Sequence, residues 1–116
     1  MEHRGQCIAV VSGKGGTGKT SFTAGVGAAL ALSGRRVLCL DCDIGLRNLD
    51  LALGLSDRTL MDFSDVAQNR CSLDLAAVEH PKIPGLFLLT APARLRGRPV
   101  TETQMTALLQ EVRWRY

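Results

Sequence analysis

The feature that most constrains the fold of this chain is a glycine-rich segment between a short apolar run and a longer run of small and apolar residues. The segment reads Gly13-Lys14-Gly15-Gly16-Thr17-Gly18-Lys19-Thr20. It satisfies the pattern G-x-x-x-x-G-K-[ST], which forms a phosphate-binding loop when a strand precedes it and a helix follows it. Residues 7–11 predict a buried strand, and residues 19–33, closed by Gly34, predict a helix. The sequence therefore supplies both neighbours that the loop requires.

The residue types in this segment suit a polyphosphate ligand. Glycines let the loop curl so that its backbone N–H groups turn toward phosphate oxygens, and the next helix adds the positive end of its dipole. Lys19 is expected to reach the β- and γ-phosphates, and Thr20 to offer its hydroxyl to Mg²⁺. A glycine-rich turn that only links strand to helix is the alternative, but it does not account for Lys19-Thr20. The predicted nucleotide-binding residues are Gly13, Lys14, Gly15, Gly16, Thr17, Gly18, Lys19 and Thr20.

Two acidic residues, Asp41 and Asp43, follow the apolar run Val37–Leu40, which predicts a second buried strand. Residues two apart in an extended chain share a face, so the two carboxylates are expected about 6 to 7 Å apart along the strand. Paired acids at the phosphate edge hold the waters of a magnesium ion or orient an attacking water. The alternative is that either carboxylate only caps the following turn.

The remaining apolar periodicity predicts a strand at Leu86–Leu89, short helices at 60–67 and 72–78, and a last helix from 101 to about 112. Alternation of strands and helices predicts an α/β fold of the P-loop NTPase type, a parallel sheet with helices on both faces. Ligands of such sheets bind at the carboxyl ends of the strands.

Local signals add detail to two of the helices. Thr101 is expected to cap the last helix, with Gln104 as its capping-box partner. Gly25 and Gly27 each weaken the helix at 19–33, so we expect the backbone there to pack closely against the sheet.

Composition sets the broad class. The chain has 116 residues, 46% of them hydrophobic, and a formal charge of +3, which suits one globular unit and carries little information about partners. Four cysteines without a signal peptide predict a reducing, cytoplasmic compartment. No apolar run approaches the roughly 18 residues of a membrane span. Three arginines cluster without aromatic residues between them, so a solvated loop is favoured over a nucleic-acid surface: Arg94, Arg96 and Arg98.

Lys14 adds a second lysine to the phosphate loop, and with it the segment resembles the deviant Walker A signature of the MinD and ParA ATPases. This resemblance implies ATP and Mg²⁺ as cofactors and a homodimer formed with ATP. It also implies that Lys14 crosses the dimer interface and stabilises charge on the partner's γ-phosphate, as an arginine finger does. The alternative for Lys14 is a lysine that faces solvent.

The residues after the second strand resemble the MinD branch in particular. They read Asp41-Cys42-Asp43-Ile44-Gly45-Leu46-Arg47-Asn48-Leu49-Asp50-Leu51. The resemblance continues through Leu53-Gly54-Leu55, Arg58, Asp62-Phe63, Asp65-Val66 and residues 86–91. It implies that Asp43 lies near the catalytic water, with Lys14 and Lys19 as the other catalytic residues. It implies that Asp41 and Thr20 support the metal shell.

Members of the MinD branch bind the inner face of the cytoplasmic membrane, recruit MinC and are stimulated by MinE, and so restrict placement of the division septum. The resemblance implies the same activity here, with MinC-like and MinE-like partners and no nucleic acid. Two alternatives stay open. One is a ParA-like or flagellar-number positioning ATPase, for which salt-dependent DNA retention would be the mark. The other is a non-catalytic remnant.

The MinD branch is about twice as long as this chain. Residues 1–116 are therefore expected to be the N-terminal part of a single P-loop ATPase domain that stops before the Walker B strand and its D-x-P-A-G motif. The adenine-gripping residues and the C-terminal membrane helix would also lie outside it. Without that strand, which the family places between the strand at 7–11 and the strand at Val37–Leu40, two apolar edges are exposed. We expect poor stability and weak nucleotide binding from this stretch alone.

Overall fold

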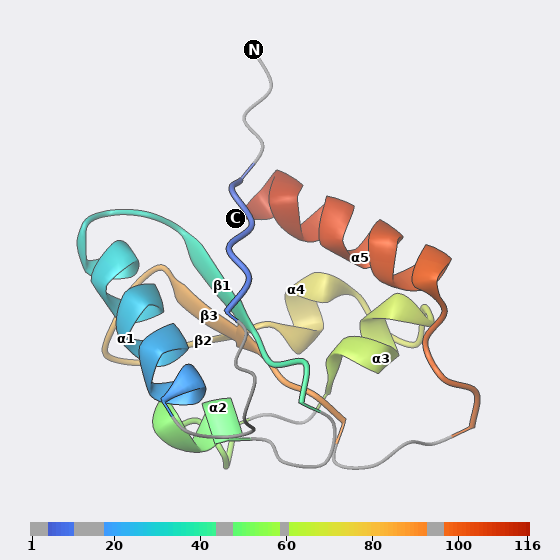
Figure 1. The fold of residues 1–116 in the computed structure, drawn as a ribbon, viewed down its shortest axis with the longest axis horizontal. Helices are drawn as coiled ribbons and strands as arrows, with labels where there is room; N and C mark the ends of the chain where they lie inside the picture. The colour runs from blue at the N-terminus through green and yellow to red at the C-terminus, as the bar shows by residue number, and fades with distance from the viewer. Residues whose placement is uncertain (1–4, 11–17, 44–47, 59–60, 93–96) are drawn as a thin grey trace.

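The computed structural model describes residues 5–10, 18–43, 48–58, 61–92 and 97–116 (Figure 1). Its helices are α1 Lys19–Leu32, α2 Asn48–Ala52, α3 Phe63–Ala67, α4 Leu73–Ala76 and α5 Glu102–Arg115, and its strands are β1 Val37–Leu40, β2 Val78–Glu79 and β3 Leu86–Leu89. The predicted strands β1 and β3 are confirmed at both ends. Helix α1 is confirmed to within one residue, and Gly34 follows it at φ 97°.

The sheet is small and mixed, with strand order β1-β3-β2. Strands β1 and β3 pair in parallel, as predicted, with Val37 opposite Leu86 and Leu40 opposite Leu89. Strand β2 pairs antiparallel with β3, so the prediction of a wholly parallel sheet is wrong. The physical reason is the connection between β2 and β3, residues 80–85, which is too short for the crossover that a parallel pair requires.

The predicted first strand at 7–11 is also wrong over the residues described. Residues 7–10 have no regular secondary structure, Cys7 is exposed rather than buried, and 63% of Ile8 is accessible. Position 11 lies outside the described residues. An apolar run becomes a strand only when a neighbour accepts its backbone hydrogen bonds. Among the described strands, β1 pairs with β3 and none pairs with 7–10.

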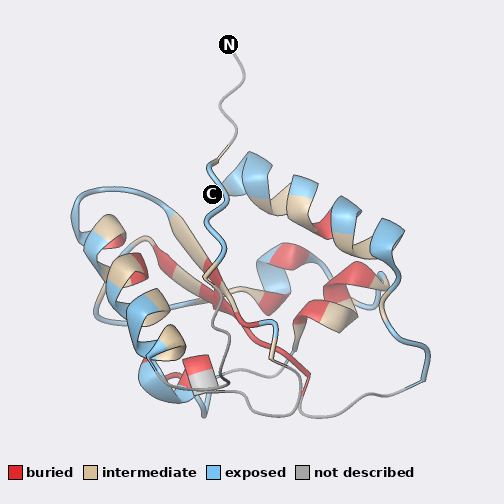
Figure 2. Cartoon of the chain, in the orientation of Figure 1, coloured by how far each residue is buried: buried red, intermediate tan, exposed pale blue. Residues whose placement is uncertain are grey.

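Helices cover both faces of the sheet, as predicted (Figure 2). The strand side chains alternate between the two faces, so each face carries its own core cluster. Helices α1 and α2 pack on the face that holds Ala31, Cys39, Leu49, Leu53, Leu55, Leu86 and Leu88. Helices α3, α4 and α5 pack on the other, which holds Phe63, Val66, Ala67, Leu73, Ala76, Leu89, Ala91 and Leu108. The sheet thus fixes the start of α1 relative to the loop that follows β1.

The expected close packing at the glycines of α1 is found at one of the two. A methyl group built on Gly27 would lie 2.5 Å from Cys39 Sγ and 3.4 Å from Leu86 Cδ1. The backbone of α1 therefore packs closely against the sheet at Gly27. Gly25 is exposed, and a methyl group built there meets nothing within 4 Å, so the expectation is wrong for Gly25.

Helix α5 carries the predicted capping box. Thr101 Oγ1 accepts a bond from the Gln104 N–H at 3.1 Å, and Gln104 Oε1 accepts one from the Thr101 N–H at 3.0 Å. The helix extends to Arg115, past the predicted end near 112. The Tyr116 ring beyond it lies edge-on to the Phe87 ring with centroids 5.2 Å apart, which ties the end of α5 to β3.

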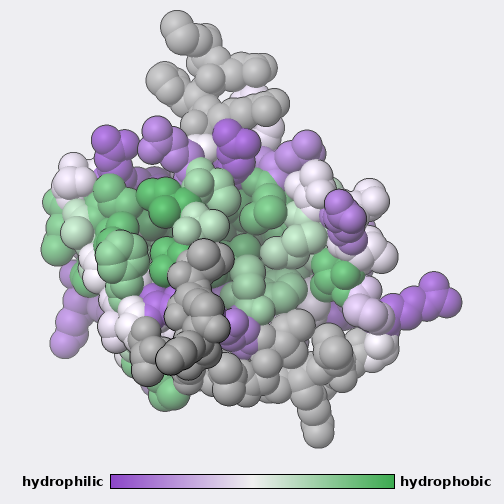
Figure 3. Space-filling model, in the orientation of Figure 1, coloured by the Kyte–Doolittle hydropathy of each residue, from purple (hydrophilic) through white to green (hydrophobic). Residues whose placement is uncertain are grey.

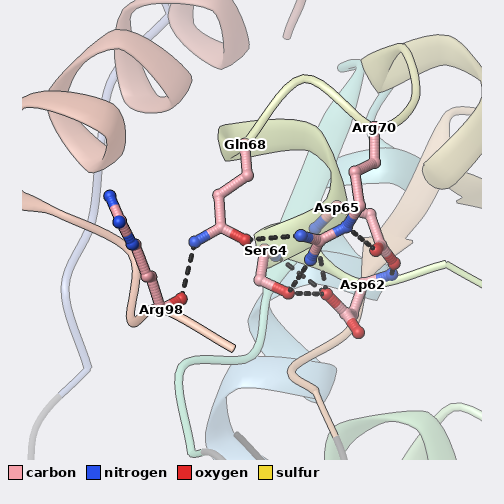
Figure 4. A network of polar contacts seen from close by, with 6 residues as sticks. All are labelled: Asp62, Ser64, Asp65, Gln68, Arg70 and Arg98. Atoms are coloured by element: carbon pink, nitrogen blue, oxygen red, sulfur yellow. Dashed lines mark hydrogen bonds and ion pairs between the residues drawn. The ribbon is translucent and has the colours of Figure 1, made fainter. Parts of the chain in front are cut away.

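Helix α3 begins with a capping box made by two aspartates. Asp62 Oδ1 accepts the N–H groups of Ser64 and Asp65, while Asp65 Oδ2 accepts the N–H of Asp62 at 3.0 Å. Arg70 folds back over this turn and donates from Nε to Asp65 Oδ1 at 2.9 Å and from Nη1 to Gln68 Oε1 at 2.7 Å (Figure 4). Polar side chains of flanking residues thus stabilise the first turn of the helix.

Candidate functional site

The structure describes the last part of the predicted phosphate loop, Gly18, Lys19 and Thr20. The other predicted nucleotide-binding residues, among them Lys14 with its predicted catalytic role, lie outside the described residues: Gly13, Lys14, Gly15, Gly16 and Thr17. Gly18 is the N-cap of α1 with φ 84° and ψ −20°, a left-handed conformation that favours glycine. The chain thereby turns from the loop directly into the helix.

The start of α1 has the chemistry of an anion site. The first N–H groups of a helix lack acceptors within the helix, and they carry the positive end of its dipole. No acidic residue lies in the first turn of α1 to neutralise it. Lys19 is the first helical residue and the half-buried Thr20 is the second, so an ammonium group and a hydroxyl group join these amides. This donor set fits a nucleotide phosphate and its magnesium ion.

Lys19 and Asp43, both predicted to be catalytic, are brought together. Lys19 Nζ lies 2.9 Å from Asp43 Oδ2, with side chains 22% and 36% exposed respectively. Lys19 comes from the start of α1 and Asp43 from the segment that leaves β1. Of the two predicted acids, Asp43 thus lies against the lysine at the start of α1, just beyond the carboxyl end of β1.

Asp41 has different surroundings. It is 7% exposed, and its carboxylate accepts backbone N–H groups at both oxygens, from Asp43 at 3.0 Å and from Leu49 at 3.3 Å. The Asp41 N–H itself donates to Leu89 O at 3.1 Å. These contacts are those of a carboxylate that caps the following turn. They leave lone pairs on the oxygens, so the predicted support of the metal shell by Asp41 stays a prediction.

The carboxylates of Asp41 and Asp43 have different partners, because β1 ends at Leu40. Beyond that residue the two-residue alternation of a strand no longer fixes side-chain direction. Asp41 turns into the segment that leads to α2, and Asp43 turns toward Lys19. Sequence reasoning missed the Asp41 to Leu49 bond, which joins residues eight apart across a segment with no regular periodicity.

Cys42 stands between the two acids but is not prepared as a nucleophile. Burial and the charges of Asp41 and Asp43 raise the pKa of the Cys42 thiol, against a smaller lowering by Lys19. The thiol therefore stays protonated near neutral pH. Burial raises the pKa of Cys39 to about 11. Within the described ranges, no group of three or more His, Cys, Asp or Glu side chains could hold a metal ion.

Two grooves flank the residues that lead into α5, on the side of the sheet away from α1. One, of about 390 Å³, is lined in part by Gln68, Arg70 and Arg98. The other, of about 400 Å³ and mostly apolar, runs from Cys42 past Phe63. Neither is lined by Lys19 or Asp43. No helix among the parts of the chain that the structure describes is long and apolar enough to cross a membrane.

Comparison with known proteins agrees with this geometry. The sequence profile of the CobQ/CobB/MinD/ParA nucleotide binding domain matches residues 8–111. The chain is 43% identical over 106 residues to the septum site-determining protein MinD of a Synechocystis strain, and 40% identical over 110 residues to that of Bacillus subtilis. The matches cover 91% and 94% of this chain but 40% and 41% of those proteins.

Solved structures give the same result. The chain aligns with MinD in a MinC:MinD cell division protein complex of Aquifex aeolicus with a TM-score of 0.77 and 39% identity. The alignment covers 88% of this chain and 39% of that one. A second structure of MinD from Aquifex aeolicus aligns with a TM-score of 0.72. The chain thus spans about 40% of the length of the relatives that it matches. With a nucleotide-binding profile along nearly its whole length, the chain belongs to the CobQ/CobB/MinD/ParA nucleotide-binding domain family and is MinD-like within it.

Proposed function

We propose that this protein binds and hydrolyses ATP as a MinD-type ATPase and helps to select the site of the division septum. The observation that carries the proposal is the 2.9 Å contact between Lys19 and Asp43 at the start of α1. It joins the lysine of the phosphate loop to the acid that is proposed to orient the attacking water. Membership of the nucleotide-binding family and identities of 40% or more to the two MinD proteins named above support it.

Each residue of the site has a proposed role. Lys19 and the amides of the loop bind the β- and γ-phosphates, and Thr20 and Asp41 support the magnesium ion. Magnesium supplies positive charge that offsets the charge developing on the transferred phosphoryl group. Asp43 orients the attacking water by accepting its hydrogen bond. Lys14 adds positive charge to the nucleotide of the partner subunit in an ATP-dependent homodimer.

The partners and the cellular location are proposed for the whole protein, because the relatives are longer than this chain. A MinC-like partner is supported by the relative that was solved as a MinC:MinD complex. A MinE-like activator and reversible attachment to the inner face of the cell membrane follow from the MinD resemblance. The protein would then be cytoplasmic without ATP, and it would form a homodimer and become a peripheral membrane protein when ATP is bound.

Loss of the Lys19 ammonium should abolish the response of the protein to Mg-ATP. In the full-length wild-type protein, Mg-ATP at a hundred times its Kd should add about 2.7 kcal/mol to the free energy of unfolding. Lys19→Met keeps the apolar stem but removes the charge that holds the phosphates, so this gain should disappear. Thermal unfolding with and without Mg-ATP measures it.

Lys82→Met is the matched control. Lys82 is exposed in the turn between β2 and β3, so its substitution should leave the gain with Mg-ATP intact. An equal gain in wild type and in Lys19→Met would refute the proposed site. Steeply salt-dependent retention on DNA would instead identify a ParA-like positioning protein. Binding of Mg-ATP without any phosphate release by the full-length dimer would identify a non-catalytic remnant.

A further inference from the structure

The Lys19 ammonium already has an anionic partner inside the protein. Asp43 Oδ2 lies 2.9 Å from Lys19 Nζ, within the range of a charge-assisted hydrogen bond. A carboxylate oxygen at this distance occupies one of the positions that a phosphate oxygen would take against the same ammonium. Both side chains are partly buried, at 22% and 36% exposed, so the pair is screened less than one in open solvent.

Asp43 is held in this position by Asp41. The Asp43 N–H donates to Asp41 Oδ1 at 3.0 Å, and the Leu49 N–H donates to Asp41 Oδ2 at 3.3 Å. Leu49 lies in α2, which packs against α1 through the core cluster on that face of the sheet. Asp41 therefore anchors the backbone at Asp43 and at Leu49, and the Asp43 carboxylate lies against Lys19.

We propose that Asp43 is a built-in competitor for phosphate at Lys19, so that phosphate binding and the release of Asp43 are a single exchange. The inference rests on the proposed function, because it concerns the same site. While Lys19 holds Asp43, that carboxylate is not available to orient a water molecule. When a phosphate takes Lys19, Asp43 loses its cation and is released toward the water that it is proposed to orient. The protein thereby keeps its catalytic acid engaged until nucleotide arrives.

The exchange affects only ligands whose phosphates reach Lys19. Mg-ADP and Mg-ATP place a β-phosphate at this lysine, so each must displace Asp43. AMP has only an α-phosphate, which does not reach it, so AMP binding leaves the pair intact. The cost of displacement therefore appears in the affinity for Mg-ADP and not in the affinity for AMP.

Asp43→Asn tests the exchange in the full-length protein, because it keeps the size of the side chain and removes its charge. Calorimetric titration should give Mg-ADP binding roughly two- to fivefold tighter than in wild type, the scale of one partly exposed ion pair. AMP binding, followed by NMR titration, should not change. Asp43→Ser provides a second neutral variant and should show the same pattern if Asp43→Asn unfolds.

Asp74→Asn is the matched control, since it removes the same charge from a more exposed ion pair, that of Asp74 with Arg115 on the opposite side of the sheet. It should leave both affinities unchanged. If Asp43→Asn binds Mg-ADP no more tightly than wild type, or if AMP binding tightens by the same factor, the exchange is refuted while nucleotide binding stands. If wild type binds neither Mg-ADP nor Mg-ATP, the proposed function fails with it.

Discussion

At the scale of single residues, Gly27 shows most directly how the sequence sets the distance between helix and sheet. Its missing side chain lets α1 approach β1 until the backbone is separated from Cys39 by little more than contact distance. Gly25 lies on the exposed side of the same helix and has no such neighbour. Both glycines weaken the helix by the same mechanism, but only Gly27 is required by packing.

Gly27→Ala should therefore destabilise the protein by about 1–3 kcal/mol, the usual range for an added methyl group in a packed core. Gly25→Ala should instead stabilise it by about 0.5–1 kcal/mol, because alanine favours the helix and space is available. Urea unfolding at constant m value measures both changes. Cys39→Ala removes the atom in the way, so it should restore part of the stability of Gly27→Ala. Equal effects at the two glycines would contradict this account.

Which single residues contact one another could be predicted from the sequence only in part, because such contacts depend on how the elements face each other. A glycine inside a helix signals a special position, but the sequence does not show which side of the helix faces the sheet. The loop pattern identified Lys19, and its approach to Asp43 followed from the meeting of strand ends at one edge. The bond that Asp41 accepts from the Asp43 N–H matches the alternative that Asp41 caps the following turn. The bond that it accepts from the Leu49 N–H is not predicted by the sequence.

At the scale of elements, the stability of the short helix α3 depends on hydrogen bonds from polar side chains. Five residues are too few for a helix to be stable by itself, so its capping box and the bonds of Arg70 stabilise its first turn. Burial acts to raise the pKa of Asp65. The hydrogen bond from the Asp62 N–H and the ion pair with Arg70 outweigh burial and hold that pKa below its ordinary value.

This lowered pKa predicts a pH dependence of stability. The unfolded chain binds the Asp65 proton at a higher pH than the folded chain does, so the ionised carboxylate stabilises the fold above the ordinary value. That stabilisation should be lost as the pH falls below about 4 and through the lower pKa of the folded state. The difference in free energy of unfolding between wild type and Asp65→Asn should thus be largest at neutral pH and shrink on acidification. A difference that stays constant from pH 7 to pH 3 would contradict it.

Helices and strands with a clear local sequence pattern could be predicted. Those that form only through contacts with residues distant in the sequence could not. Strands β1 and β3 are dense apolar runs, and α5 carries a capping box, so each was found within a few residues. Helix α2 has five residues, and its Leu49 N–H depends on Asp41, while β2 has two residues and exists by pairing with β3. Residues 7–10 have a strand composition, but no described strand is hydrogen-bonded to them in the sheet.

At the scale of the whole molecule, helices cover both faces of the sheet, but several large apolar side chains remain exposed to solvent. Figure 3 shows hydrophobic atoms gathered across the front of the molecule, with hydrophilic groups along its upper rim. Large apolar side chains are more than half exposed at Ile8, Phe22, Leu32, Leu51 and Leu75.

We propose that the main-chain amides of residues 13–20 surround the triphosphate of a bound nucleotide. Hydrogen exchange of the full-length protein, with and without saturating Mg-ATP, reads these amides directly. Exchange at residues 13–20 should slow about a hundredfold when Mg-ATP is present at a hundred times its Kd. Bound Mg-ATP, proven by calorimetry on the same sample, with no change in exchange anywhere in residues 13–20 would contradict it.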